Sequence, residues 1–185
     1  IHDQPDPDWL LRDDVAEGLG LVEAAGLPFD LVAVLPRHLE HVDHLSQRFP
    51  ALTVVIDHLA KPPVGTGRRQ PWRELMARAA SNPRVVAKLS GLYPAGRGPT
   101  PGADDLRPWI ADAIELFGPD RLLVGSDWPV AEGAGGYRAV LGSVIRVVRD
   151  LLPDADAARV LAGTATRVYG LDRPGNPRAS TTDTD

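Results

Sequence analysis

Short, almost continuously apolar runs alternate along the chain with longer segments in which apolar residues recur at helical spacing. Four apolar runs have the pattern of strands buried on both faces, at 29–35, 52–57, 85–89 and 121–125. Helical spacing covers six segments, at 13–25, 39–49, 72–80, 106–117, 137–152 and 154–169. Strands that alternate with helices predict a parallel α/β sheet with right-handed crossover connections.

This alternation continues without an internal repeat, so residues 1–172 are predicted to be part of a single domain. The remaining segment, 173–185, is rich in Pro, Ser and Thr and is predicted to be a disordered tail. The chain opens on Ile1 rather than on Met, and we expect that an N-terminal part of the natural protein precedes it.

Composition excludes several classes of function. Lys and Arg number 20 against 25 Asp and Glu, and a net charge of −5 does not favour a nucleic-acid partner. The longest apolar runs are far shorter than the roughly 20 residues that cross a bilayer, so no membrane segment is expected. The chain has 0 Cys, which excludes thiolate zinc sites and cysteine nucleophiles and favours a cytoplasmic location. A small-molecule substrate is the expected partner.

Polar side chains follow each predicted strand at the point where it ends. The segments concerned are 36–38, 57–63, 90–93 and 126–129. Because the carboxyl ends of parallel strands lie on one side of a sheet, these segments are expected to meet there. The sequence therefore predicts a functional site along this edge of the sheet.

Asp127 and His58 are the candidate catalytic residues. Asp127 lies between Ser126 and Trp128 after an apolar strand, where a carboxylate is suited to proton transfer. The alternative is an aspartate that caps a helix or holds a turn. His58 is suited to polarising a carbonyl, binding a metal or orienting water, and the alternative is a histidine that fixes the turn before Pro62.

His38, Lys88 and Trp128 are the candidate substrate contacts. Lys88 lies within a strand, where an unpaired ammonium is costly, so it is expected to reach either a substrate anion or a buried acid. Trp128 is placed to form the wall of a pocket. Asp57 is expected to point away from His58 and to accept a structural hydrogen bond.

The spacing of His38, His41 and His44 suggests a metal site, but it is not the favoured interpretation. His41 and His44 lie in a segment with Glu40 and Asp43 that is typical of a solvated helix face.

Four sequence segments together resemble the amidohydrolase-related proteins of the sugar-lactonase type. They are VVIDHLAKPP (54–63), VVAKLSGLY (85–93), RLLVGSDWPV (121–130) and HDQPDPDWLL (2–11). The resemblance implies a TIM barrel, a (β/α)8 fold, of which this chain covers roughly the C-terminal half with parallel strands five to eight. Residues 1–4 would then be a remnant of the fourth strand.

The same resemblance implies roles for two residues. Asp127 matches the aspartate expected to activate water, and His58 matches a histidine that aids carbonyl polarisation or ligates an ion. One divalent, zinc-like metal held by His58 and Asp127 is one expectation, and a metal-free reaction is the other. The His-x-His pair of the first strand has no counterpart in this sequence.

We therefore expect a hydrolase of cyclic esters, with this fragment inactive by itself. The rival expectation is a non-catalytic half-barrel that associates with other copies of itself through open sheet edges.

Overall fold

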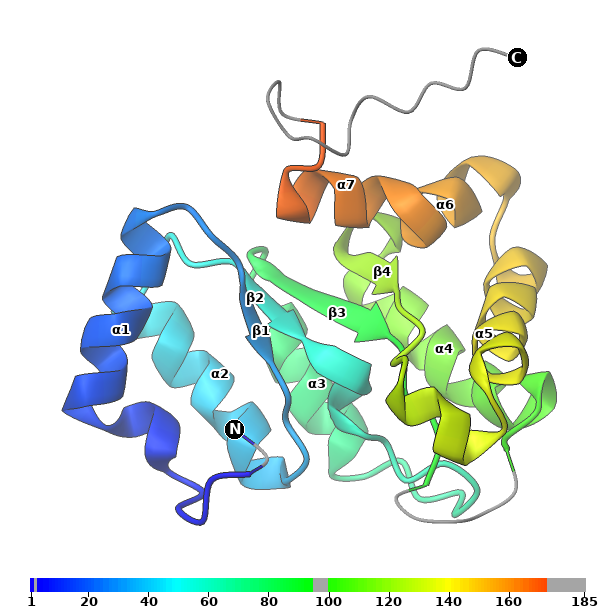
Figure 1. Ribbon diagram of the computed structural model, residues 1–185, viewed down its shortest axis with the longest axis horizontal. Coiled ribbons are helices and arrows are strands. Elements are labelled where there is room, and N and C mark those ends of the chain that lie inside the picture. The colour runs from blue at the N-terminus through cyan, green and yellow to red at the C-terminus, as the bar shows by residue number, and fades with distance from the viewer. Residues whose placement is uncertain (2, 95–99, 173–185) are drawn as a thin grey trace.

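The computed structural model describes residues 1, 3–94 and 100–172, and it contains one parallel four-stranded sheet in the order β1-β2-β3-β4 (Figure 1). The strands are β1 (Phe29–Leu31), β2 (Val54–Ile56), β3 (Val85–Leu89) and β4 (Leu122–Val124). Phe29 pairs with Val54, and Val54 pairs with Val85. The predicted parallel α/β class is confirmed. The predicted tail lies outside the described residues.

Seven α-helices connect and flank these strands in the described part of the chain. They are α1 (Asp13–Ala24), α2 (Pro36–Arg48), α3 (Trp72–Ala80), α4 (Ala103–Phe117), α5 (Tyr137–Leu151), α6 (Asp154–Ala158) and α7 (Thr164–Tyr169). Helix α2 begins three residues earlier than predicted, because Pro36 fits the first helical turn. A π-helical turn, Arg159–Gly163, divides the predicted last helix into α6 and α7.

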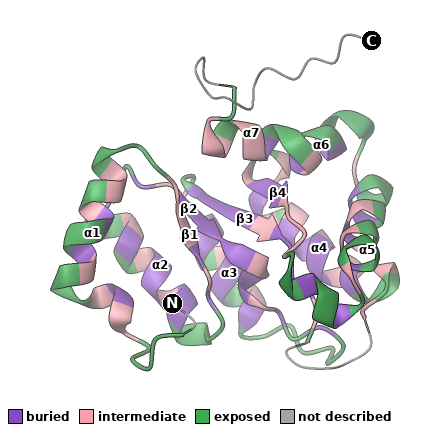
Figure 2. Ribbon diagram, viewed as in Figure 1, coloured by how far each residue is buried: buried purple, intermediate pink, exposed green. Residues whose placement is uncertain are grey.

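The two faces of the sheet contact different helices, and Figure 2 shows β2 and β3 as mostly buried. One core joins alternate strand residues to α2, α3 and α4, and includes Val54, Ile56, Val85, Ala87, Leu89 and Leu122. The residues between them form a second cluster with α7, which contains Val55, Val86, Leu123, Ala165, Val168 and Tyr169. Since successive strand residues point to opposite faces, α7 lies on the face opposite α2, α3 and α4.

A polar cluster lies next to α7 on that second face. Lys88 Nζ is 2.5 Å from both Asp30 Oδ1 and Asp57 Oδ1, and the Tyr169 hydroxyl donates to Asp30 Oδ1 at 2.7 Å. Burial lowers the pKa of Lys88, but the bonds to Asp30 and Asp57 outweigh burial and hold this pKa above its usual value. Burial and the bond to Asp30 raise the pKa of Tyr169 to about 12. This geometry favours the interpretation of Lys88 as the partner of a buried acid, Asp57, together with the half-buried Asp30.

Replacing Lys88 with Met is expected to lower the free energy of unfolding by about 2–4 kcal/mol, because two carboxylates lose their cation in a partly buried position. Chemical denaturation measures this change. The matched control is Arg107→Met, which breaks the exposed pair of Arg107 with Asp150 and is expected to cost less than about 1 kcal/mol. Equal effects of the two variants would contradict the structural role of Lys88.

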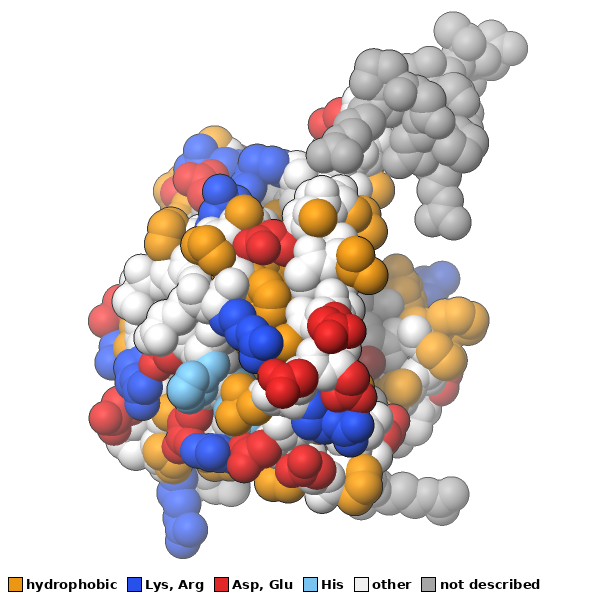
Figure 3. Space-filling model, turned by 90° about the vertical axis from the view of Figure 1, so that its left-hand side faces the viewer, with side chains coloured by type: hydrophobic (Ala, Val, Ile, Leu, Met, Phe, Trp, Pro, Cys, Tyr) orange, Lys and Arg blue, Asp and Glu red, His pale blue; other side chains and the backbone are white. Residues whose placement is uncertain are grey.

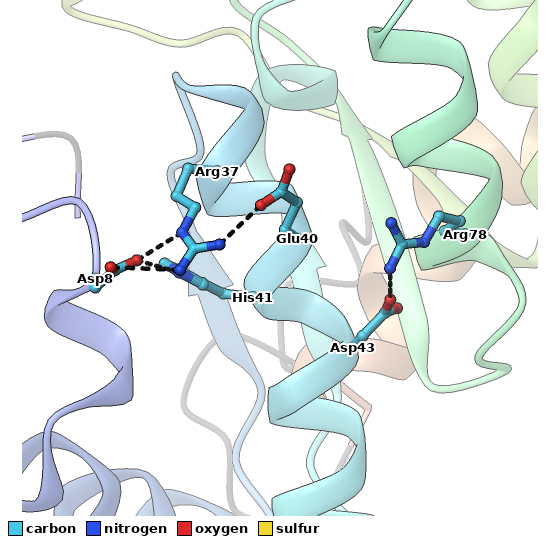
Figure 4. A network of polar contacts seen from close by, with 6 residues as sticks. All are labelled: Asp8, Arg37, Glu40, His41, Asp43 and Arg78. Atoms are coloured by element: carbon cyan, nitrogen blue, oxygen red, sulfur yellow. Dashed lines mark hydrogen bonds and ion pairs between the residues drawn. The ribbon is translucent and has the colours of Figure 1, made fainter.

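A second polar network joins the segment before α1 to α2, and α2 to α3 (Figure 4). Asp8 Oδ1 lies 2.7 Å from Arg37 Nε and 2.9 Å from His41 Nε2. Arg78 of α3 pairs with Asp43 of α2. These contacts fix α2 between its neighbours on one side of the sheet.

The prediction that His41 shares a solvated face with His44 is wrong for His41, which is 0% exposed. His38, His41, Val42 and Leu45 all lie on the buried stripe of α2. Their spacing of three or four residues places them on one side of the helix. His44 is exposed, as predicted.

The surface seen in Figure 3 carries positive and negative side chains interspersed. That face therefore presents no continuous basic surface of the kind that binds a phosphate backbone. Among the described residues, no helix has the length and apolarity needed to span a bilayer.

Candidate active site

The segments that follow β2, β3 and β4 bring His58 and Asp127 together. His58 Nε2 lies 3.6 Å from Asp127 Oδ1, and the two side chains are 14% and 13% exposed. The predicted convergence of these two residues at the carboxyl ends of the strands is therefore present in the structure.

A left-handed turn follows β2 and positions His58. The φ angles of His58, Leu59, Ala60 and Lys61 are 56°, 48°, 56° and 51°, although none of these residues is Gly. This conformation costs roughly 1–2 kcal/mol per residue. The Lys61 amide donates to the His58 carbonyl at 2.8 Å, and Trp72 Nε1 of α3 donates to the Leu59 carbonyl at 2.6 Å. A backbone held in so costly a conformation is typical of a functional site.

Asp127 is a further non-glycine residue with a left-handed backbone, and its φ is 57°. Its Oδ2 accepts a hydrogen bond from the Tyr93 hydroxyl at 2.5 Å. The 3-10 helix that follows, Val130–Ala134, has no side-chain cap. The carboxylate therefore faces the residues of the other loops instead of capping the next element, which was one of the two structural alternatives for Asp127.

Gly91 marks the point on which these side chains converge. A Cβ atom at Gly91 would lie 2.5 Å from Asp127 Oδ2, 2.7 Å from His58 Nδ1 and 2.9 Å from Lys61 Nζ. Its φ of 56° is also in the left-handed region. Only glycine lets the backbone after β3 approach the three side chains this closely.

The surroundings of His58 favour the neutral form of its imidazole. Burial lowers its pKa first and the charge of Lys61 lowers it further, while Asp127 acts in the opposite direction. Nδ1 lies 2.8 Å from Ser90 Oγ. Because the Asp127 carboxylate lies on the Nε2 side of the ring, the favoured tautomer carries its proton on Nε2. Nδ1 then accepts a hydrogen bond from the Ser90 hydroxyl. The Nε2 N–H is thus directed toward the space beside Asp127.

Lys61 and Tyr93 complete the cluster. Lys61 Nζ lies 3.6 Å from Asp127 Oδ2, donates to the Gly91 carbonyl at 3.0 Å, and is 4.8 Å from the centre of the Tyr93 ring. Burial lowers the pKa of Lys61, while the negative charge of Asp127 acts to raise it. Burial and the bond to Asp127 raise the pKa of Tyr93, so its hydroxyl stays protonated and donates.

Sequence reasoning selected His58 and Asp127 but not Lys61, Gly91 or Tyr93 as site residues. All three lie in the segments after strands β2 and β3 that were identified as polar strand ends. Their position after a strand was the signal that could have identified them. Their residue types alone did not distinguish them from the other polar residues of these segments.

Histidine burial has a measurable consequence for stability. Because the pKa of His58 is lowered from 6.5 in the folded chain, the unfolded chain binds the proton more tightly, and stability is expected to fall as the pH drops below 6.5. Thermal unfolding of His58→Gln should lose part of this pH dependence. The control is exposed His44→Gln, which should retain it; identical pH dependence in wild type and His58→Gln would contradict the expectation.

The three predicted substrate contacts lie in different surroundings. His38 is in the first turn of α2, is 2% exposed, and accepts a hydrogen bond from the Val34 amide at 3.2 Å. Little of its surface is left for a ligand. Trp128, next to Asp127, is 65% exposed and is available to one. Lys88 is engaged by Asp30 and Asp57.

The described residues do not by themselves form a metal centre. In that part of the chain no group of three or more His, Cys, Asp or Glu side chains is placed to hold an ion. His58 and Asp127 supply two donors, whereas catalytic zinc sites use three protein ligands. The ammonium of Lys61, 3.6 Å from Asp127 Oδ2, also repels a cation there. The donor set of this part of the chain therefore does not fit a catalytic zinc ion.

A cavity of about 200 Å³ adjoins the cluster on the side of β1 and α2. Its lining is mostly apolar and includes Val34, Leu35, Leu39, Ala60, Lys61 and Trp72. Lys61 belongs both to this lining and to the cluster at Asp127.

Known proteins resemble this chain over almost its whole length. It is 39% identical over 178 residues to an L-fucono-1,5-lactonase of Burkholderia ambifaria, and 34% identical over 190 residues to an L-fucono-1,5-lactonase of Burkholderia multivorans. These alignments cover 94% and 96% of this chain, but 60% and 63% of the relatives. The chain therefore spans less than two thirds of the length of these relatives.

Solved structures agree with the sequence comparison. A zinc-bound amidohydrolase of Burkholderia multivorans superposes with a TM-score of 0.78 at 31% identity, covering 91% of this chain and 61% of that one. A putative 2-pyrone-4,6-dicarboxylic acid hydrolase of Pseudomonas putida superposes with a TM-score of 0.67 at 20% identity and shows the shared fold. The expected relation to the TIM-barrel fold is confirmed. The amidohydrolase family model matches residues 1–171, and the chain belongs to this family.

Proposed function

We propose that the chain carries the water-activating part of a lactonase site, and that this site hydrolyses a cyclic ester of the sugar-lactone class. The observation that carries the proposal is the convergence of His58 and Asp127, from the ends of two different strands, on one partly buried point beside Gly91. The names of the two L-fucono-1,5-lactonases support this substrate class.

In the first step Asp127 takes a proton from water. The Tyr93 hydroxyl donates a hydrogen bond to Asp127 Oδ2 at 2.5 Å. Oδ1 is therefore the oxygen that accepts the proton. The hydroxide equivalent adds to the lactone carbonyl carbon, and negative charge develops on the carbonyl oxygen. The Nε2 N–H of His58, 3.6 Å from Oδ1 and thus beyond hydrogen-bond length, is available to stabilise that oxygen.

In the second step the carbonyl re-forms and the bond between the carbonyl carbon and the ring oxygen breaks. The leaving oxygen takes the proton held by Asp127, which returns the carboxylate to its starting state. One water and one lactone thus give one hydroxy acid.

The sequence led us to expect that this chain is inactive by itself, and the proposal departs from that expectation because His58, Tyr93 and Asp127 all lie within the chain and meet. It is tested by following acid release from L-fucono-1,5-lactone in a pH-stat with the full 185-residue chain. Hydrolysis at least about tenfold above the spontaneous rate, lost in Asp127→Asn, is the expected result. It corresponds to a barrier lowered by about 1.4 kcal/mol or more. Hydrolysis at the spontaneous rate by the wild-type chain contradicts the proposal.

A second candidate function is self-association. In the described residues β1 and β4 are the edge strands of the sheet, and unpaired strand edges favour pairing with other chains. Sedimentation of the same preparation measures it: soluble oligomers without lactone hydrolysis would favour association over catalysis.

A further inference from the structure

The cluster at Asp127 contains a lysine that neither the family match nor the proposed chemistry uses. Lys61 reaches the cluster because the left-handed turn ends on it, with a φ of 51°. The other lysine of the chain, Lys88, is held by Asp30 and Asp57. Lys61 is therefore the lysine whose ammonium faces the Asp127 carboxylate.

The ammonium of Lys61 has hydrogen-bonding capacity that these contacts do not fill. Of its three N–H groups, one donates to the Gly91 carbonyl at 3.0 Å. Asp127 Oδ2 lies 3.6 Å away, which is longer than a hydrogen bond, so the ammonium is not fully engaged by the carboxylate. The side chain is 30% exposed, so a ligand can reach it.

The proposed reaction needs a cation at this position. Opening a lactone gives a carboxylic acid that ionises at neutral pH, and this new carboxylate lies close to Asp127, which is again negatively charged once it has given its proton to the leaving oxygen. Two like charges within about 4 Å repel each other by roughly 1 kcal/mol in water and by more in a partly buried site. An ammonium between them offsets that repulsion and donates charge-assisted hydrogen bonds to the new carboxylate.

We propose that Lys61 binds the carboxylate of the ring-opened hydroxy acid and the oxyanion that precedes it, and is thus a catalytic residue of this site. The inference rests on the proposed lactone hydrolysis for its chemistry. It adds a residue that contacts the reacting carboxyl group directly, whereas Ser90 acts through His58, and Tyr93 acts through Asp127.

Titration calorimetry of the full chain with L-fuconate, the acid formed by opening L-fucono-1,5-lactone, tests the inference. Lys61→Met keeps most of the side-chain volume and removes the charge, and is expected to weaken L-fuconate binding by about tenfold or more. Lys61→Arg keeps the charge and should bind within about threefold of wild type. The matched control, Arg68→Met, removes an exposed positive charge from the same loop and should change nothing.

Equal binding of L-fuconate by wild type and Lys61→Met, or no binding by wild type, overturns the inference. If the wild-type chain binds L-fuconate through Lys61 but does not hydrolyse the lactone, the proposed function is contradicted. The anion site at Lys61 is then still supported.

A second variant keeps the test independent of the folding of Lys61→Met. Asp127→Asn removes the negative charge 3.6 Å from Lys61 Nζ. If the ammonium holds the carboxylate, L-fuconate should bind about fivefold more tightly to Asp127→Asn than to wild type. Unchanged or weaker binding would overturn the inference.

Discussion

Replacing Asp127 with Asn is expected to lower kcat for lactone hydrolysis by about 10²- to 10⁴-fold, which is the usual contribution of a positioned general base. The amide keeps the size of the carboxylate, so packing against Tyr93 and Gly91 is retained. It cannot accept a proton from water at neutral pH. Initial rates at saturating lactone measure the effect.

The control for this variant is Asp104→Asn, because Asp104 is an exposed carboxylate in the first turn of α4. It is expected to retain wild-type kcat. Circular dichroism of both variants checks that the fold is unchanged. An Asp127→Asn chain with wild-type kcat would remove Asp127 from the reaction and with it the proposed mechanism.

The strands and most helices were predictable because burial on both faces leaves a continuous apolar run in the sequence. Residues 85–89 and 72–80 were predicted at the bounds that the structure has for β3 and α3. The strands at 29–35 and 52–57 are shorter in the structure, since the ladder ends before the apolar run does. Apolar character reports burial, whereas the extent of a strand depends on which backbone groups find a partner.

His41 shows where residue type misleads. A histidine between Glu40 and Asp43 has the polar pattern of a solvated face, yet it is buried against Asp8, which lies 33 positions earlier in the chain. A partner so distant in sequence leaves no local signal. Helical spacing from His38 was the better guide than the polarity of neighbouring residues.

The site was predictable as a location but only in part as a set of residues. The loops that follow the strands were identified from parallel topology, and His58 and Asp127 do meet there. The inclusion of Lys61 depends on a left-handed turn through four consecutive non-glycine residues, including Leu59 and Ala60. No composition rule predicts such a turn, because its cost is offset by tertiary contacts such as the Trp72 bond to the Leu59 carbonyl.

Gly91→Ala tests directly whether His58, Lys61 and Asp127 act as one site. The added methyl group would lie 2.5 Å from Asp127 Oδ2 and 2.7 Å from His58 Nδ1, so both side chains must move. Displacements of this size are expected to lower kcat/KM for the lactone by about 10²-fold or more. The left-handed φ adds a destabilisation of roughly 1–2 kcal/mol.

Gly26→Ala separates these two effects, because Gly26 has a similar φ of +65° and no atom within 4 Å of an added Cβ. It is expected to lose roughly 1–2 kcal/mol of unfolding free energy and to keep wild-type kcat/KM. Denaturant unfolding and lactone kinetics on both variants give the comparison. Since the backbone strain is shared, any difference in activity between the two variants reports the crowding around Gly91. Equal activities would mean that the space beside this glycine is not where the lactone reacts.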